Sequence, residues 1–218
     1  MVSSRMIVFA PHPDDETLAC GGTIIRKIRE GFDVHIVVMT DGRHSHDVTL
    51  GLAEPSPENI AKIRATEFRE ATRVLGVNPG NLILLKFEDG KLREHMAEAE
   101  ERTVQILRQL VPTEIYTSYR HDTNDDHRTT YEIVTDSVRE ADQLPKMYEY
   151  SVWNGKTACP GLKVFVMNIH GELKRKMEAI SKYKSQISTC FPKQGKAVLS
   201  EEFVNTFRSE NETFYAKE

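Results

Sequence analysis

The sequence predicts an α/β protein in three layers, with a mainly parallel sheet of strand order 3-2-1-4-5 and helices on both faces. Short apolar runs alternate with longer amphipathic stretches from residue 6 to about residue 141, which is typical of a parallel sheet covered by helices. The first runs carry almost no charge, as buried strands do. The 218 residues, 28% of them charged, suit a single domain over residues 1–218.

The individual elements follow from residue spacing and from stop signals. Apolar runs predict strands at residues 6–10, 34–40, 82–85 and 114–118. One-sided apolar spacing predicts helices at about 18–28, 58–76, 96–111 and 126–141. Gly31 and Gly76 stop the first two helices, and Pro112 closes the third. Beyond these we expect strands at 146–153 and 163–168, and helices at about 171–186 and 200–208.

The turn after the first strand carries four side chains with possible chemistry: His12, Asp14, Asp15 and Glu16. Such a turn lies at the carboxyl edge of a parallel sheet, where open α/β folds build their sites. Imidazole and carboxylate are ordinary zinc ligands, and a second carboxylate beside them could manage the protons of metal-bound water. The structural alternative is that Asp14 or Asp15 caps the following helix.

A metal site needs a third ligand, and the topology points to the turn after the fourth strand. In a right-handed doubly wound sheet the first and fourth strands are neighbours, and the loops after them open a crevice. Residues 119–127 form the second of these loops and end in His127. The first turn of a helix disfavours imidazolium, which suits a neutral ligand. His127 is therefore the candidate third ligand, and an ordinary surface histidine is the alternative.

The connection from residue 41 to about residue 57 is long for a compact domain, which predicts a substrate loop or a mobile one. Arg43 could meet a phosphate or a sugar hydroxyl there, or be solvated. His44 and His46 are expected to be solvated rather than to bind metal. Trp153 could stack on a sugar face or be buried at the end of a strand.

Composition and charge exclude several classes of protein. A net charge of −4 with scattered basic residues gives no electrostatic case for nucleic acid or an anionic membrane. No apolar stretch is long enough to span a bilayer, and no secretory signal is visible, so membrane insertion is not expected. The three cysteines are far apart, which argues against a disulfide framework and fits a reducing cytoplasm.

Three motifs together resemble the LmbE/PIG-L family of zinc-dependent N-acetylglucosaminyl de-N-acetylases. They are Ala-Pro-His-Pro-Asp-Asp-Glu at 10–16, Gly-Gly-Thr at 21–23, and Asp-His-Arg at 126–128. The resemblance implies a Rossmann-like sheet and a zinc ion (Zn2+) held by His12, Asp15 and His127. It also implies that Asp14 is the general base that takes a proton from zinc-bound water, and that the substrate is a small N-acetylated sugar or glycoconjugate.

The sequence departs from the family pattern at Asn124, where many members carry a histidine that stabilises the oxyanion or protonates the amine. Asn124 and His121 are the candidates for that role. Asp89, after the third strand, matches an acidic position that resembles a sugar-contacting residue in relatives. A turn aspartate before Gly90 is the alternative.

Two other functions stay open from the sequence. A sugar- or nucleotide-binding module could use the same crevice without catalysis, although the pair of acids argues against it and no Gly-x-Gly-x-x-Gly phosphate loop is present. A zinc site of this kind could also hydrolyse a different amide or ester. A homo-oligomer is possible, and the sequence does not decide the oligomeric state.

Overall fold

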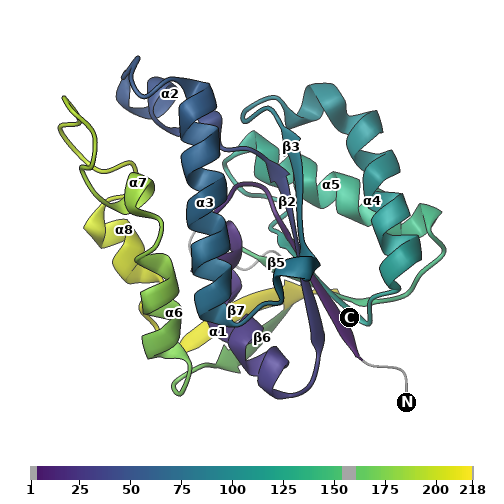
Figure 1. Cartoon of the computed structure of the whole chain (residues 1–218). Helices are drawn as coiled ribbons and strands as arrows, with labels where there is room; N and C mark the ends of the chain where they lie inside the picture. The colour runs from purple at the N-terminus through teal and green to yellow at the C-terminus, as the bar shows by residue number, and fades with distance from the viewer. Residues whose placement is uncertain (1–3, 154–160, 218) are drawn as a thin grey trace.

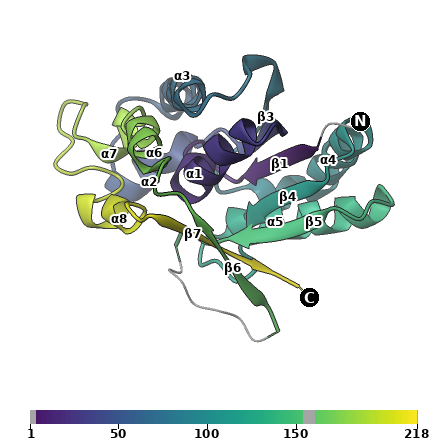
Figure 2. The ribbon, with the colours of Figure 1, turned by 90° about the horizontal axis from the view of Figure 1, so that it is seen from below.

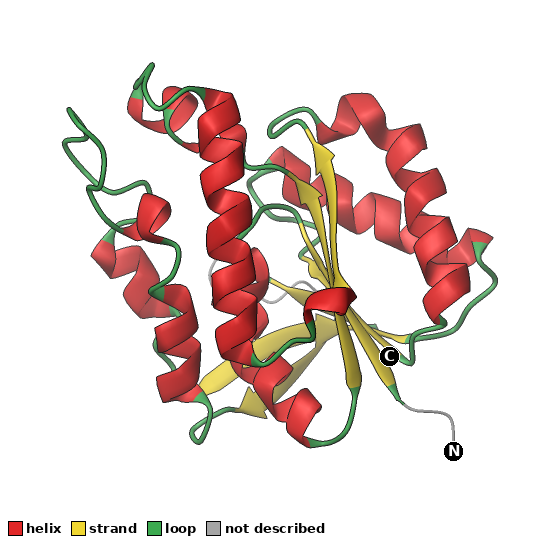
Figure 3. Ribbon diagram, viewed as in Figure 1, coloured by secondary structure: helices red, strands yellow, loops and turns green. Residues whose placement is uncertain are grey.

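The computed structural model describes residues 4–153 and 161–217, in which one sheet runs through the centre of the molecule (Figure 3). Its strand order is β3-β2-β1-β4-β5-β7-β6. The predicted order 3-2-1-4-5 is confirmed for the five parallel strands, and β7 and β6 add an antiparallel edge. The strands are β1 (Arg5–Ala10), β2 (Asp33–Thr40), β3 (Leu82–Phe87), β4 (Glu114–Ser118), β5 (Lys146–Tyr150), β6 (Lys163–Asn168) and β7 (Asn211–Ala216).

Helices cover both faces of the sheet, as predicted (Figures 1 and 2). One face carries α1 (Asp15–Arg29), α3 (Pro57–Leu75) and α6 (Leu173–Ile180), and the other carries α4 (Met96–Leu110) and α5 (Asp125–Glu140). Shorter helices lie in the connections: η1 (Arg43–Ser45), α2 (Asp47–Leu50), η2 (Pro79–Asn81), η3 (Leu92–His95), α7 (Lys184–Ile187) and α8 (Glu201–Thr206). Within the described ranges, no helix combines the length and apolar character needed to cross a bilayer.

The central strand β1 explains why its sequence is free of charge. Met6 and Val8 pack into the cluster under α1 and α3, while Ile7 and Phe9 pack into the cluster under α4 and α5. All four side chains are fully buried. Because successive residues of a strand face opposite sides, a strand between two helical layers needs apolar residues at every position.

The C-terminal third differs from the sequence prediction. The single helix expected at 171–186 is two helices, α6 and α7, and the strand expected at 146–153 ends at Tyr150. Strand β7 was not predicted at all. Its sequence, Asn-Glu-Thr-Phe-Tyr-Ala, lacks a clean apolar pattern because a buried glutamate, Glu212, stands at its second position.

Glu212 joins β7 to the middle of α1. Its carboxylate accepts hydrogen bonds from the backbone N–H groups of Gly22 and Thr23, both at 2.8 Å, and lies 2.8 Å from Lys176 Nζ. A glycine is needed at position 22 for another contact, since a Cβ there would lie 2.5 Å from Ile169 Cδ1. The Gly-Gly-Thr motif therefore has a structural role: it lets α1, the helix that begins at the site turn, pack closely against Ile169 and hydrogen-bond to Glu212.

Replacing Lys176 by methionine should destabilise the fold by about 3–5 kcal/mol, because it leaves the Glu212 carboxylate buried without its counter-charge. The midpoint of urea unfolding measures the loss. The double variant Lys176→Met/Glu212→Gln removes both charges and should recover part of it. An unchanged midpoint in the single variant would show that the pair is not needed.

Candidate metal centre and active site

A cavity of about 720 Å³ opens at the carboxyl ends of the parallel strands. Segments that follow β1, β2, β3, β4 and β5 all contribute to its wall, which is where an open α/β sheet places a site. Four residues predicted to act in the site line the cavity together with His12: Asp14, Asp15, Asp89 and Asn124. The two turns that the topology was expected to bring together do meet.

The turn between β1 and α1 holds Asp14 in an unusual backbone conformation, with φ at 133°. Glu16, which is fully buried, accepts a hydrogen bond from the Asp14 N–H at 3.1 Å and another from the Tyr183 hydroxyl. The Asp14 side chain makes no capping bond, although Asp14 occupies the position before α1. The capping alternative is therefore wrong for Asp14, and Glu16 serves to hold the turn.

Two imidazoles and one carboxylate converge beside this cavity, which His12 and Asp15 line and His127 does not. Asp15 Oδ2 lies 3.3 Å from His12 Nδ1 and 3.2 Å from His127 Nε2. Potential ligand atoms of the three residues all lie within 4.8 Å of one another, so the group could hold a metal ion. His127 is completely buried, yet neither of its ring nitrogens makes a hydrogen bond of acceptable geometry. Buried polar atoms normally have a partner, so the unsatisfied ring nitrogens of His127 are consistent with a role as a metal ligand.

The electrostatics of this group follow from burial and close pairing. Burial acts to raise the pKa of Asp15, but the two imidazoles outweigh it and hold the pKa well below its usual range. Burial acts to lower the pKa of His127, but Asp15 and Asp122 outweigh it and raise the pKa to about 9. Asp15 is therefore held as a carboxylate, the form that binds cations. The expectation that the first turn of the helix disfavours imidazolium at His127 was wrong for the metal-free site, because the two carboxylates outweigh the helix N-terminus. A metal ion bound at His127 would have to displace this proton.

A second group of possible ligands shares His12. Its Nε2 lies 3.2 Å from Asp89 Oδ1 and 3.2 Å from Asp126 Oδ2, and the three residues also meet the distance limit for a metal. Both Asp126 oxygens, however, already accept backbone N–H groups, from Gly90 at 2.7 Å and from Leu92 at 3.2 Å. Asp126 thus ties the segment after β3 to the first turn of α5.

Asp14 lies beside the first group and contacts a buried arginine. Arg64 Nη2 donates to Asp14 Oδ2 at 2.9 Å and to the Pro13 carbonyl at 2.6 Å, and Nη1 donates to the Gly42 carbonyl at 3.0 Å. Burial raises the pKa of Asp14 to about 7, although the Arg64 guanidinium opposes the rise. A carboxyl group with such a pKa can both accept and release a proton near neutral pH.

The remaining predicted site residues have different surroundings. Asn124 is the N-cap of α5, where its Oδ1 accepts the His127 N–H at 3.4 Å, so its Nδ2 hydrogens are its donors. His121 is exposed, packs edge-on against Tyr119 and does not line the cavity. Arg43 Nε and Nη2 both donate to Asp41 Oδ2, at 2.8 and 2.5 Å, and Arg43 does not line the cavity either.

Several residues of the site escaped the sequence analysis. Arg64 and Tyr183 were not singled out as site residues, and neither was Asp122, whose Oδ2 lies 3.4 Å from His127 Nδ1. The expectation that His46 is solvated was wrong, because it is fully buried with its ring against Phe191. The sequence around His46, a polar loop with a second histidine at position 44, did not indicate that His46 is buried.

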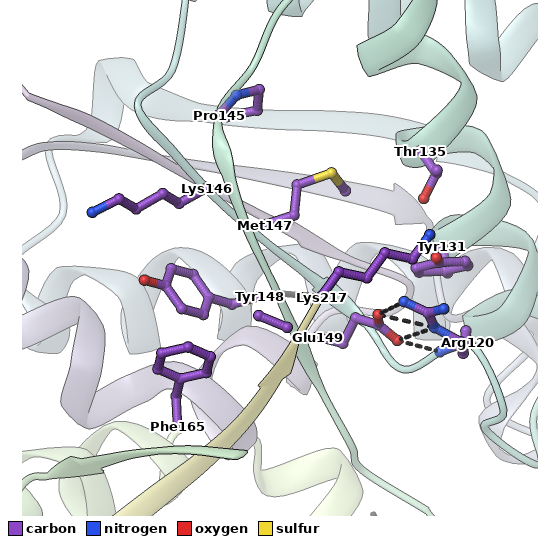
Figure 4. A pocket seen from close by; sticks show the side chains of 11 residues that line it. Arg120, Tyr131, Thr135, Pro145, Lys146, Met147, Tyr148, Glu149, Phe165 and Lys217 are labelled. Carbon is purple, nitrogen blue, oxygen red and sulfur yellow. Dashed lines mark hydrogen bonds and ion pairs between the residues drawn. The ribbon is translucent and has the colours of Figure 1, made fainter. Parts of the chain in front are cut away.

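Another cavity, of about 460 Å³, lies away from these groups between α5 and the antiparallel edge of the sheet (Figure 4). Arg120 and Glu149 form an ion pair there, and Tyr131 stacks under the guanidinium at 4.9 Å. None of the predicted site residues lines it. The larger cavity, of about 720 Å³, is therefore the candidate active site, because the predicted catalytic and metal-binding residues lie in or beside it.

Sequence comparisons give a consistent family. A model of the PIG-L family, described as GlcNAc-PI de-N-acetylase, matches residues 7–138. A probable N-acetyl-alpha-D-glucosaminyl L-malate deacetylase 2 of Bacillus cereus is 26% identical over 84% of this chain and 83% of its own length. A 1D-myo-inositol 2-acetamido-2-deoxy-alpha-D-glucopyranoside deacetylase of a Mycobacterium is 30% identical over 66% of this chain, which spans about half (53%) of that relative.

Solved structures confirm the fold. The N,N'-diacetylchitobiose deacetylase of Pyrococcus horikoshii matches with a TM-score of 0.68 and 23% identity, covering 88% of this chain and 72% of its own. The 4-carboxy-2-hydroxymuconate hydratase GalB of Pseudomonas putida matches with a TM-score of 0.72 and 16% identity, covering 94% and 82%. Because one of these is a hydratase, the shared fold alone does not decide the reaction.

Proposed function

The chain belongs to the PIG-L family, and from this premise we propose that it is a zinc-dependent hydrolase that removes the N-acetyl group from a GlcNAc-like amino sugar or glycoconjugate. The products are acetate and the free amine. The observation that carries the proposal is the convergence of the His12 and His127 imidazoles and the Asp15 carboxylate beside a cavity that His12, Asp14 and Asp15 line.

We assign His12, Asp15 and His127 as the metal ligands. Two nitrogen ligands and one carboxylate are a common donor set for catalytic zinc, and they leave a coordination position open. The second group fits less well, because backbone N–H groups engage both Asp126 oxygens, whereas in Asp15 such a group, His12 N–H, engages Oδ2 and leaves Oδ1 free of one. When bound, a zinc ion supplies a Lewis acid that polarises an amide carbonyl and makes water more acidic.

The protein's own groups then handle the protons and orient the substrate. Asp14, held by Arg64 and by the Glu16 contact to its backbone, accepts the proton of the attacking water and passes it to the departing amine. Asn124 donates an Nδ2 hydrogen to the carbonyl oxygen as negative charge develops there. We assign Asp89, which lines the cavity, to the sugar hydroxyls. Arg43 is proposed to reach the substrate only after leaving Asp41.

Asn124→Ala should lower turnover across the whole pH range, by about 10- to 1,000-fold for one lost donor. His121→Ala is the matched control, because its ring is exposed and outside the cavity lining. It should leave the alkaline limb of the pH–rate profile in place. If His121→Ala instead abolishes that limb and most of the activity, His121 has the role that we assign to Asp14 and Asn124.

The proposed reaction is tested by incubating the zinc-loaded protein with a panel of N-acetylated sugars and assaying both acetate and free amine. Equal amounts of the two products, suppressed by a chelator and restored by zinc, are the expected result. Saturable sugar binding without acetate would identify a binding module instead. Acetate from acetyl esters but from no N-acetylated sugar would identify a different hydrolase.

We place this activity in one catalytic domain over residues 1–218, because both helical layers pack on a single sheet. Cys20 and Cys190 are free thiols, which supports a reducing compartment such as the cytoplasm; Cys159 lies outside the described residues.

A further inference from the structure

The backbone of Asp14 has a conformation that glycine adopts readily and other residues do not. Its φ is 133° and its ψ is −30°. Among the described residues, the other non-glycine residues with positive φ have values between 46° and 65°, close to the left-handed α well: Lys86, Val111, Asp142 and Lys193. Asp14 lies far outside that well. Strained conformations of this kind persist only where the surrounding structure enforces them.

The peptide group that joins Pro13 to Asp14 is held at both ends. Its carbonyl oxygen, on Pro13, accepts a hydrogen bond from Arg64 Nη2 at 2.6 Å, and its N–H, on Asp14, donates to Glu16 Oε2 at 3.1 Å. On the other side of the Asp14 Cα, the Asp14 carbonyl accepts two backbone N–H groups from the first turn of α1, at 3.0 and 2.9 Å. The groups on both sides of the N–Cα bond are thus fixed, so φ cannot relax.

The φ of Asp14 sets the geometry of the site. His12 precedes the N–Cα bond of Asp14 in the chain, whereas the Asp14 carboxylate and Asp15 follow it. This dihedral angle therefore decides how the His12 ring faces Asp15, whose Oδ2 lies 3.3 Å from His12 Nδ1. Release of the strain would change the relative position of two proposed metal ligands and of the proposed base.

Tyr183 supports the Glu16 carboxylate that holds the N–H end. Glu16 is fully buried, and its Oε1 accepts hydrogen bonds from the hydroxyl groups of Thr17 and Tyr183. Thr17 is the next residue of α1, whereas Tyr183 lies 167 positions away, between α6 and α7. Of these two donors, Tyr183 is therefore the one that fixes the carboxylate from outside α1. Its own ring is only 1% exposed.

Helix α3 supports both ends of the held peptide group. Arg64 reaches the carbonyl end directly. Glu67, three residues further along and on the same face of the helix, accepts the Ser185 N–H at 2.8 Å and the Ser185 hydroxyl at 2.6 Å. These bonds fix the segment that carries Tyr183. Helix α3 thus holds the carbonyl end itself and the N–H end through Tyr183 and Glu16.

We propose that Tyr183 is a positioning residue, which through Glu16 keeps Asp14 in its strained conformation and so holds His12, Asp14 and Asp15 in the arrangement that the metal and the reaction require. Tyr183 is not among the residues that line the cavity, so it acts through the turn and not on the substrate. The inference rests on the proposed deacetylase only for the role of Asp14 in the reaction.

Tyr183→Phe tests the effect on the metal site, because it removes only the hydroxyl that donates to Glu16. We expect the zinc Kd, measured by competition with a chelating dye, to rise about 10- to 100-fold, as for other residues that orient metal ligands. The kcat for acetate release should fall as well. Tyr150→Phe is the matched control, because Tyr150 is fully buried and its hydroxyl donates to the Phe9 carbonyl at 2.7 Å. It should change neither quantity, and an unchanged Kd in Tyr183→Phe would overturn the inference.

A second measurement detects the strain without zinc or substrate. Glycine adopts positive φ at little cost, so Asp14→Gly relieves strain where strain exists. With a chelator present, Asp14→Gly should shift the urea midpoint of unfolding about 0.5 M further in the stabilising direction in the unchanged protein than in Tyr183→Phe, where the strain is already released. The loss of the Arg64 partner is common to both and cancels. Tyr150→Phe should behave as the unchanged protein does, and equal shifts in all three backgrounds would overturn the inference.

These measurements separate the inference from the proposed reaction. Neither the zinc Kd nor the unfolding midpoint depends on acetate release, so an unchanged protein that releases no acetate would count against the deacetylase alone. Glu16→Gln is the second variant, should Tyr183→Phe fail to fold. An amide has one oxygen, so it cannot accept the Asp14 N–H and the Tyr183 hydroxyl on separate oxygens. The same rise in zinc Kd is expected, and its absence has the same consequence.

Discussion

Asp14→Asn is expected to lower turnover at least about 100-fold while the metal stays bound. The asparagine has the same size and can still accept the hydrogen bond that Arg64 Nη2 now donates at 2.9 Å. It cannot accept a proton from water, so the reaction loses its base while the turn keeps its shape. Steady-state kinetics and metal analysis of the same preparation separate the two effects.

Asp136→Asn is the control for this experiment, because Asp136 is an exposed acid on α5 paired with Arg139. Its turnover should match that of the unchanged protein. If Asp14→Asn retains full turnover with metal bound, the base lies elsewhere. Glu16 is the remaining acid of the same turn, but its carboxylate is engaged by the Asp14 N–H, Thr17 and Tyr183.

His127→Ala is expected to abolish stoichiometric metal binding, which should be about one ion per chain in the unchanged protein. The fold should survive, because the smaller side chain removes a buried imidazole that makes no hydrogen bond of its own. Atomic absorption after dialysis measures the metal, and circular dichroism checks the fold.

Asp122→Asn provides the graded comparison. Asp122 Oδ2 lies 3.4 Å from His127 Nδ1, on the side of the ring away from Asp15. Loss of such a supporting carboxylate typically weakens metal affinity by 10- to 100-fold without abolishing it. Full metal retention by folded His127→Ala would refute the three-ligand assignment. An unchanged affinity in Asp122→Asn would show that Asp122 does not support His127 as a ligand.

The parallel part of the fold was predictable because its signals are local. The run at 6–10 has no charge since β1 is buried on both faces, and strand order followed from the handedness of the crossovers. The pairing of the turns that carry His12 and His127 followed from the same order. The catalytic and ligand roles remain predictions, which the experiments above address.

The parts that were missed depend on long-range contacts. Arg64 reads as an ordinary charged residue of α3, and its burial depends on Gly42, where a Cβ would lie 2.4 Å from the Arg64 Nη1. Strand β7 was missed because Glu212 points inward to Lys176. A charged residue in a strand usually indicates the face exposed to solvent, but here it lies on the buried face. The spacing of apolar residues within a short stretch of sequence cannot reveal contacts with residues that are distant along the chain.

The anchoring of α1 by Glu212 also has a kinetic consequence. The hydrogen bond from Gly22 N to Glu212 Oε1 joins residues 190 positions apart, and that from Thr23 N joins residues 189 apart. Closing so long a loop costs chain entropy before the contact repays it, so contacts of this separation form late in folding. The ribosome delivers the chain from its N-terminus. The turn that carries Asp14 and Asp15 is therefore made well before Glu212, and the helix that follows it gains this support only after residues 24–211 have been synthesised.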